Sequence, residues 1–493
     1  MSFIKLTEEM LNYAFTENGD KAYKTSGSWC LDYFSLVGGM RFNYNEALNN
    51  FIKAYCEDPI LAIKIMFFAR DIRSGLGERN IFRVAFNSLA NVCPDVAYQL
   101  LKYIPEYGRY DDLQSAYDTP LRSDVIKMIK EQLDKDIEAK KNQKEISLLA
   151  KWLPSINTSS FETRELANKI AKDLGLKKEE YRKMLSFLRN GMIVENNLRE
   201  KKYDFDYSNV PGKAMFKYQD AFLRNDKEKY LLYLDNVKEG KAKINSKTIY
   251  PYEIVRKFEN EYGYFSLNNM TKSEIESLDT IWNSFDRNSI ASKTIVVRDG
   301  SGSMYDSMPV NASSVATSLA LLFSERLTGE FKNKFITFSS EPKLVEVKGN
   351  RIDEKLRNIF NYNDCSNTNI SKVYQLIYSV YCSPKFTKED ALDRIVIISD
   401  MEFDCLGKKN TSTFEEFKDK FKELGYEMPE LVFWNVRSRS THLPVTKNEK
   451  NVKLISGSSS NVIDMVTTNS SKTPYEFMLE CLEKYSCFDN IVI

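Results

Sequence analysis

The chain has 493 residues, of which 42% are hydrophobic, and its 70 basic and 69 acidic side chains leave a net charge of +1. This length exceeds what one hydrophobic core usually supports, so we expect roughly two or three globular domains and not a disordered chain. A net charge so close to zero excludes an overall attraction to nucleic acid, and any basic binding surface must be local.

The sequence favours a cytoplasmic protein without a membrane span. Lys5, Glu8 and Glu9 stand where a secretory signal needs an apolar stretch, so we expect no signal peptide. The most apolar segment, residues 60–69, contains Lys64 and is far shorter than the roughly 20 residues that cross a bilayer. The eight cysteines are scattered and form no Cys-x-x-Cys pair, which favours free thiols over disulfides or a zinc site.

Residues 43–285 show the periodicity of successive amphipathic helices, with apolar side chains at steps of three and four. Ala47, Phe51 and Ala54 are one example. Proline and glycine interrupt the pattern at intervals of ordinary helix length. Such a run of helix pairs predicts a solenoid-like stack of α-helical repeats, which we place at residues 1–288, although no strict sequence period accompanies it.

The pattern changes after residue 286, where short β-branched runs alternate with helical stretches. The runs lie at 294–297, 335–338, 395–399 and 431–434. Strands without polar alternation are typical of a parallel sheet covered on both faces. The intervening helices are expected at 311–327, 370–381 and 414–424. These βα units predict an α/β doubly wound, Rossmann-like domain at residues 289–493, with ligands at the carboxyl ends of its strands.

Oxygen-bearing side chains gather at that expected edge. Asp299, Ser301 and Ser303 follow the first strand directly. Thr368 precedes a helix, and Asp400 directly follows the run 395–399. Mg²⁺, and also Mn²⁺ or Ca²⁺, prefers such hard oxygen ligands. Aspartates that merely cap helices or turns are the alternative, but caps would not require oxygen-bearing side chains at all five positions.

Together these five residues resemble the metal-ion-dependent adhesion site of the von Willebrand A domain. The resemblance implies that the hydroxyl groups bind the cation directly, that the aspartates bind it directly or through water, and that an acidic side chain of a protein partner completes the coordination. The sequence supplies no convincing general base, and we expect Glu402 to be solvated. We therefore expect a binding protein and not an enzyme, with a metal-dependent hydrolase as the least favoured alternative.

The helical half resembles the TROVE-type module of the Ro autoantigen family, and more closely its Ro-like relatives. The matching segments are FFARDIRSGLGERNIFR (67–83), YIPEYGRYDDL (103–113), AKWLPS (150–155), KMLSFLRNG (183–191) and ISDMEFD (398–404). The resemblance implies a ring of HEAT-like repeats closed by the von Willebrand A domain. It also implies a ribonucleoprotein that binds small non-coding RNA or the single-stranded ends of misfolded RNA.

A local basic surface is the candidate for contact with RNA. Residues 181–250 hold 15 Lys or Arg and 9 Asp or Glu, and aromatic side chains lie among them. Cations suit phosphates and aromatic rings stack on unpaired bases, but an ordinary helical surface of mixed charge has the same composition, so both interpretations stay open. The candidate RNA-binding residues are Arg182, Lys183, Arg189, Arg199, Lys201, Lys202, Lys213 and Lys217.

Arginines near residue 75 also allow two interpretations. Arg70, Arg73 and Arg79 surround a glycine-containing turn, and guanidinium groups suit phosphate oxygens. Carboxylates between packed helices could equally pair with them, and we favour that structural role. For Arg109 and Asp111, in the segment 103–113, we likewise expect buried polar pairing at a helix junction.

The leading functional hypothesis is a non-enzymatic, cytoplasmic, Ro-like RNA-binding protein whose metal site holds a second partner. The alternative is a metal-dependent protein-interaction scaffold, or a component of a larger assembly, without RNA.

Overall fold

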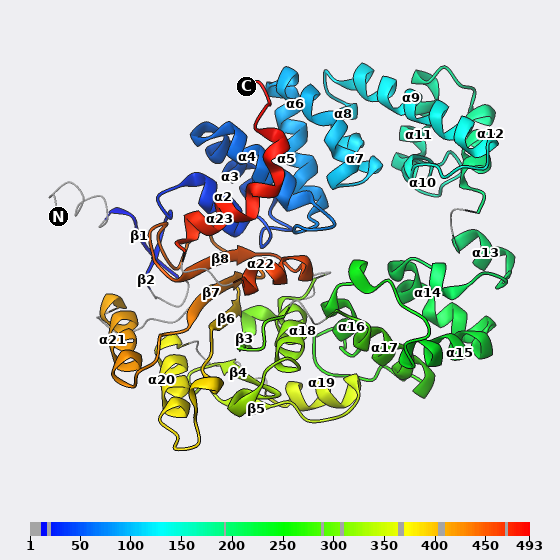
Figure 1. Ribbon diagram of the computed structural model, residues 1–493. Coiled ribbons are helices and arrows are strands. Elements are labelled where there is room, and N and C mark those ends of the chain that lie inside the picture. Colours follow the sequence, from blue (N-terminus) through cyan, green and yellow to red (C-terminus); the bar gives the residue numbers. More distant parts are fainter. Residues whose placement is uncertain are drawn as a thin grey trace.

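The computed structural model describes residues 11–16, 21–191, 194–286, 290–305, 310–362, 369–402, 410–468 and 472–493. Within them a helical region is followed by a six-stranded sheet with flanking helices, which confirms the expected order of the two architectures. Figure 1 shows the helical region along the top and right and the sheet below it. None of the described helices has the length and apolarity that crossing a membrane requires.

The helical region follows a short antiparallel hairpin of β1 (Tyr13–Phe15) and β2 (Lys21–Tyr23). Its first helices are α2 (Trp29–Leu36), α3 (Tyr44–Glu57), α4 (Pro59–Arg70), α5 (Arg79–Val92), α6 (Pro94–Leu100), α7 (Ile104–Tyr107), α8 (Gln114–Tyr117), α9 (Arg122–Lys141) and α10 (Leu149–Trp152). The later ones are α11 (Phe161–Asp173), α12 (Lys178–Arg189), α13 (Val194–Glu200), α14 (Gly212–Asn225), α15 (Lys227–Lys238), α16 (Pro251–Lys257) and α17 (Lys272–Asn283). The short 3-10 helices η1 (Leu101–Tyr103) and η2 (Tyr110–Leu113) lie among them.

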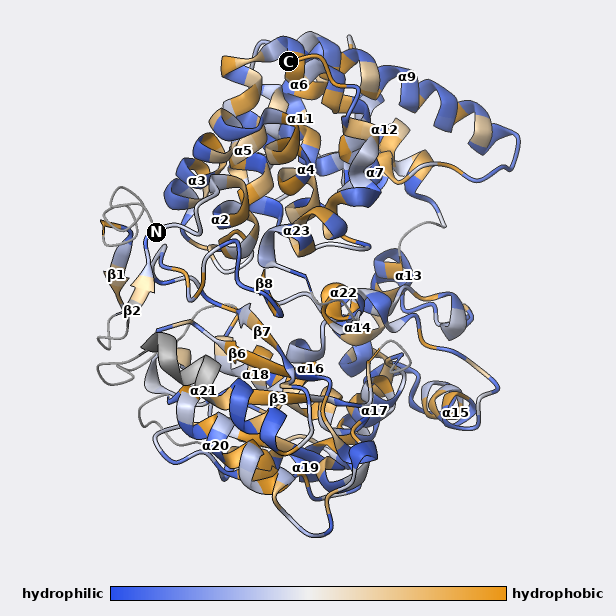
Figure 2. Ribbon diagram, turned by 60° about the vertical axis from the view of Figure 1, so that its left-hand side comes forward, coloured by the Kyte–Doolittle hydropathy of each residue, from blue (hydrophilic) through white to orange (hydrophobic). Residues whose placement is uncertain are grey.

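Local sequence explains where these helices begin and which side they bury. Asp58 accepts a hydrogen bond from the backbone N–H of Leu61, and Pro59 starts α4 with a backbone angle that suits a first helical turn. In α5, the buried residues Ile81, Phe82, Ala85, Phe86 and Leu89 form a single apolar stripe at helical spacing. Figure 2 shows the contrast between apolar strands such as β6 and the largely hydrophilic surface of α9.

The sheet has the strand order β5-β4-β3-β6-β7-β8. Its strands are β3 (Thr294–Asp299), β4 (Lys334–Phe338), β5 (Leu344–Glu346), β6 (Arg394–Ser399), β7 (Glu430–Asn435) and β8 (Val452–Ser456). All neighbouring pairs are parallel except β4 and β5, so the sheet is mixed at one edge, where we expected a parallel one. The four predicted strands are confirmed, whereas β5 and β8 were not predicted.

Helices lie on both sides of this sheet (Figure 1). They are α18 (Ala312–Ser324), α19 (Ile352–Phe360), α20 (Ile370–Tyr381), α21 (Asn410–Glu423), α22 (Ile463–Thr467) and α23 (Pro474–Leu482). The three predicted helices correspond to α18, α20 and α21. Every residue of α18 is buried, because this helix lies between β3 and α16 of the helical region.

Both ends of the helical region contact the α/β part of the chain, so the two parts together form a closed arrangement (Figure 1). At one end α2 packs on β8, and at the other α16 packs on α18. The last residues return to the first helices: Phe477 of α23 contacts Phe34, and Phe488 stacks on Phe67 with ring centroids 4.4 Å apart. The carboxyl edge of the sheet therefore lies beside the helical region.

Candidate functional site

The ends of two neighbouring strands bring the predicted metal ligands together. β3 ends at Asp299 and β6 ends at Ser399, and the two strands are parallel and paired residue by residue. Ser399 Oγ donates a hydrogen bond of 2.5 Å to Asp299 Oδ2. Asp400 follows Ser399 immediately, so its carboxylate comes to the same edge as that of Asp299.

The loop after β3 wraps closely around Asp299. The backbone N–H of Ser301 donates to Asp299 Oδ1 at 2.8 Å, and the hydroxyl oxygens of Ser301 and Ser303 lie 3.1 Å apart. Ser303 also donates a hydrogen bond to the carboxylate of Asp400. Four of the five predicted ligands therefore converge, and Thr368 lies outside the described residues.

The two carboxylates lie in an unfavourable setting for negative charge. Asp299 is 1% exposed, and burial together with the charge of Asp400 raises its pKa to about 6. Burial also raises the pKa of Asp400, although the hydrogen bond from Ser303 and the charge of Arg439 offset part of this effect. Two buried, mutually repelling carboxylates are stabilised by any positive charge placed between them.

The oxygen atoms available fit a hard divalent cation. Asp400 Oδ2 is buried and accepts no hydrogen bond from a described residue, and Arg439 Nη1 lies 3.8 Å away. Two carboxylates and two hydroxyl groups form a donor set that Mg²⁺, Mn²⁺ and Ca²⁺ prefer. The described residues hold no cluster of three or more His, Cys, Asp or Glu side chains suited to a metal, so this site depends on its hydroxyl groups.

The loop after β7, residues 436–451, supplies contacts that the sequence did not reveal. Arg437 Nη1 donates to the carbonyl oxygen of Ser303 at 2.9 Å. Ser440 Oγ donates to Glu402 Oε1 at 2.7 Å, and Glu402 is only 4% exposed. Our expectation that Glu402 is solvated is therefore wrong, because a hydroxyl from this loop satisfies its buried carboxylate. The alternating Arg-Ser-Arg-Ser at 437–440 was the available signal.

The same loop joins the site to the helical region. The backbone N–H of Ser438 donates a hydrogen bond to the carbonyl oxygen of Gly39 at 2.9 Å. Leu443 and Tyr23 exchange two backbone hydrogen bonds of 2.9 Å. The backbones are also close at Gly38, where a Cβ atom would come within 2.7 Å of Gly457. The candidate metal site thus lies at the contact between the two parts of the chain.

The predicted RNA-binding residues fall into two groups. Arg182, Arg199 and Lys201 are exposed and form no ion pair with a described residue. The other five have neighbours within the protein. Lys183 pairs with Glu179, Lys202 with Glu200 and Lys213 with Glu253, Lys217 lies over the ring of Tyr218, and Arg189 donates to Ala150 O, Leu153 O and Ser155 Oγ. The second group is engaged in local structure.

The arginines near residue 75 confirm the structural interpretation in part. Arg70 Nη2 lies 2.7 Å from Asp112 Oδ2, and both side chains are buried. Arg73 donates to the carbonyl oxygen of Glu106. Arg79 is half-exposed and reaches Asp111 only at 3.5 Å. Arg70 and Asp112 are therefore a buried pair between α4 and η2, while Arg79 is weakly held.

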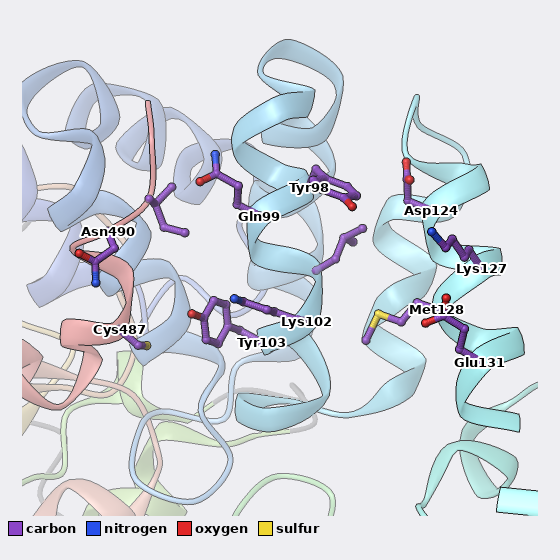
Figure 3. Close-up of a pocket in the computed structure, with 12 residues that line it drawn as sticks. Tyr98, Gln99, Lys102, Tyr103, Asp124, Lys127, Met128, Glu131, Cys487 and Asn490 are labelled. Carbon is purple, nitrogen blue, oxygen red and sulfur yellow. The ribbon is translucent and has the colours of Figure 1, made fainter. Parts of the chain in front are cut away.

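A groove of about 480 Å³ lies between α6, α9 and the C-terminal tail, away from the sheet edge. Figure 3 shows Tyr98, Lys102 and Tyr103 on one wall and Lys127 and Glu131 on the other. Its charges are balanced, since Asp124 and Glu131 accompany the two lysines. Nothing in this lining selects a charged ligand.

Comparison with known proteins identifies relatives without an assigned activity. Residues 16–107 and 114–288 match the family described as Domain of unknown function (DUF2828), and residues 293–480 match another described as Domain of unknown function (DUF7788). The Uncharacterized protein L728 of Acanthamoeba polyphaga mimivirus is 31% identical over 517 residues, which cover 97% of this chain and 88% of that protein. The crystal structure of Deinococcus radiodurans RO (RSR) protein aligns over 87% of this chain and 91% of that chain, with a TM-score of 0.31 and 11% identity.

Proposed function

Since this chain belongs to the DUF2828 family, whose description assigns no activity, we propose a function from the sheet edge: Asp299, Ser301, Ser303 and Asp400 bind a divalent cation that recruits an acidic partner. The single observation that carries this proposal is the pair of buried carboxylates, Asp299 and Asp400, whose charges oppose each other. Thr368 is the expected fifth ligand.

The chain's own residues position this site for binding. Ser399 holds one oxygen of Asp299, and the N–H of Ser301 holds the other, so the carboxylate has a fixed orientation. Arg437 holds the loop through the carbonyl oxygen of Ser303. A bound divalent cation would supply the positive charge that attracts a partner's carboxylate. Glu402 is buried and accepts a hydrogen bond from Ser440, and we propose binding and not catalysis.

Calorimetric titration of Mg²⁺ and Mn²⁺ into the full-length, metal-free protein tests the proposal. We expect one saturable site, lost in Asp400→Asn and retained in Asp220→Asn, which changes an exposed aspartate of α14. Equal binding by both variants would contradict the assignment. A partner retained with Mg²⁺ by the wild type, but neither with EDTA nor by Asp400→Asn, would establish the recruiting role.

RNA binding is a second candidate function, favoured by the exposed Arg182, Arg199 and Lys201, which form no ion pair within the described part of the chain. The test is purification from the native host without nuclease, followed by sequencing of any RNA that copurifies. The triple alanine variant of these residues should lose that RNA, and Lys183→Ala/Lys202→Ala, which removes two lysines already paired with acids, should keep it. RNA affinity should also fall steeply with salt concentration.

A further inference from the structure

Five cationic side chains and two carboxylates lie close together where α5, η2 and α10 meet. The cations are Arg70, Arg79, Arg83, Arg109 and Lys151, and the acids are Asp111 and Asp112. Arg70 and Arg83 both contact Asp112, at 2.7 and 2.9 Å. Arg83 also lies 2.9 Å from Asp111, which Arg79 reaches at 3.5 Å. Arg70 and Arg83 therefore engage both acids, although Asp111 Oδ1 is buried and accepts no hydrogen bond from a described residue.

Arg109 forms no ion pair with a described residue. Its guanidinium donates no hydrogen bond to any described residue and instead lies over the ring of Trp152, 4.5 Å from the ring centroid. Burial lowers the pKa of Arg109 and the charges of Arg79 and Arg70 lower it further, whereas the charges of Asp111 and Asp112 offset part of this effect. The five cations of the cluster outnumber its two carboxylates, so Arg109 would attract a further negative charge.

Two more cations border the same tryptophan. Lys151 Nζ lies 5.8 Å and the guanidinium carbon of Arg79 lies 6.0 Å from the ring centroid of Trp152. Lys151 forms no ion pair or hydrogen bond with a described residue. The nearby Glu78 does not neutralise these cations, because its carboxylate accepts hydrogen bonds from Arg41 Nε at 2.9 and 3.0 Å.

The cluster lies where an outside ligand can approach it. Arg79 is 38% exposed at the first residue of α5, and Arg109 and Trp152 are half-buried. In Figure 1, α10 lies on the side of the upper helices that is turned toward α13 and α14. Guanidinium groups present parallel N–H donors that match phosphate oxygens, and lysine adds a point charge.

We propose that Arg79, Arg109 and Lys151 form a phosphate-binding site, with Trp152 as the surface that holds the guanidinium of Arg109 in place. The site is independent of the metal centre, and it includes none of the eight residues predicted to bind RNA. The phosphate could belong to a free small molecule or to a nucleic acid, and these two sources are separated by experiment.

Trp152 is itself a reporter of this site. The chain has four tryptophans, of which Trp282 and Trp434 are fully buried and Trp29 lies on α2. The full-length protein is titrated at constant ionic strength with inorganic phosphate, uridine monophosphate or an oligouridylate, and tryptophan fluorescence is followed. We expect a saturable change that is absent in Trp152→Phe.

Variants separate specific binding from general charge. Arg109→Gln should weaken the affinity for the phosphate probe at least tenfold. Arg109→Lys keeps the charge but loses the paired N–H donors, so its affinity should lie between those of Arg109→Gln and the wild type. Arg164→Gln is the matched control, because Arg164 also lies over an aromatic ring, that of Phe161, at 5.8 Å. Thermal unfolding of each variant confirms that it is folded.

The outcomes are distinct. Saturation by inorganic phosphate or the mononucleotide identifies a free phosphate ligand, and saturation by the oligouridylate alone identifies nucleic acid. No saturable signal with any of the three probes, or equal affinity in Arg109→Gln and Arg164→Gln, would overturn the proposal. Metal binding at Asp299 and Asp400 is measured separately, so either proposal can fail without the other.

Discussion

Ser399 Oγ lies 2.5 Å from Asp299 Oδ2, so the end of β6 orients the carboxylate that ends β3. Groups that orient metal ligands in this way usually contribute about 10–100-fold to metal affinity. We therefore predict that Ser399→Ala weakens Mn²⁺ binding by about that factor, without changing the number of sites, in a calorimetric titration. An unchanged affinity would mean that Ser399 has no part in the site.

The buried pair of Arg70 and Asp112 predicts a large effect on stability. Their side chains are 2% and 0% exposed, and removing Arg70 leaves Arg83 as the remaining cationic partner of the buried Asp112. We expect Arg70→Met to lower the free energy of unfolding by about 1.5–3 kcal/mol in urea denaturation, the usual cost of losing a buried hydrogen bond to a charged group. Arg122→Met is the control, because Arg122 pairs with Asp173 but is half-exposed, and its loss should lower the stability much less. Similar losses in the two variants would contradict this account.

The close backbone contact at Gly38 predicts that a single methyl group weakens the joint between the helical region and the sheet. A Cβ atom there would lie 2.7 Å from the backbone of Gly457 and of Ser456, so the two chain segments must separate. We expect Gly38→Ala to cost about 1–3 kcal/mol of stability in urea denaturation. Gly302→Ala, where a Cβ atom has no neighbour within 4 Å, should be tolerated. Equal stability of the two variants would show that the segments are not held in this contact.

Glu259 links the turn after α16 to α18 and predicts a pH effect. Burial raises its pKa above the ordinary 4.5, although hydrogen bonds from Ser314 and Arg256 offset part of the shift. The folded protein therefore holds this proton to higher pH than the unfolded chain, and wild-type stability falls as pH rises through that window. The free energy of unfolding of Glu259→Gln minus that of the wild type should therefore be larger at pH 7 than at pH 4 in urea denaturation. A difference that does not change with pH would contradict the buried charge.

Periodicity predicted the strands that are apolar throughout and the helices that bury one apolar face. β8 was not predicted because Lys453 interrupts its apolar pattern. Only the fold shows that Glu430, 3.1 Å away on β7, pairs with this fully buried lysine. β5 has three residues at an edge, too few for any pattern. Local sequence therefore predicts elements well where burial is apolar, and less well where a distant residue neutralises a charge.

The candidate site, too, could be predicted from the sequence only in part. Asp299, Ser301, Ser303 and Asp400 follow strands directly, so their convergence could be predicted from the order of the elements. Arg437 and Ser440, in contrast, reach the site from a loop that a different strand positions, and such contacts leave no local pattern. The basic surface shows the same limit, because a composition of charges does not reveal which lysines already have acidic partners.

The most direct test of the central claim is a crystal structure of the full-length protein soaked with Mn²⁺, with anomalous scattering used to locate the metal. The account predicts one anomalous peak within coordination distance of Asp299, Ser301, Ser303 and Asp400, and no such peak in crystals of Asp400→Asn. A saturated wild-type crystal with no peak between these residues, or with its peak elsewhere, would contradict the proposed metal site.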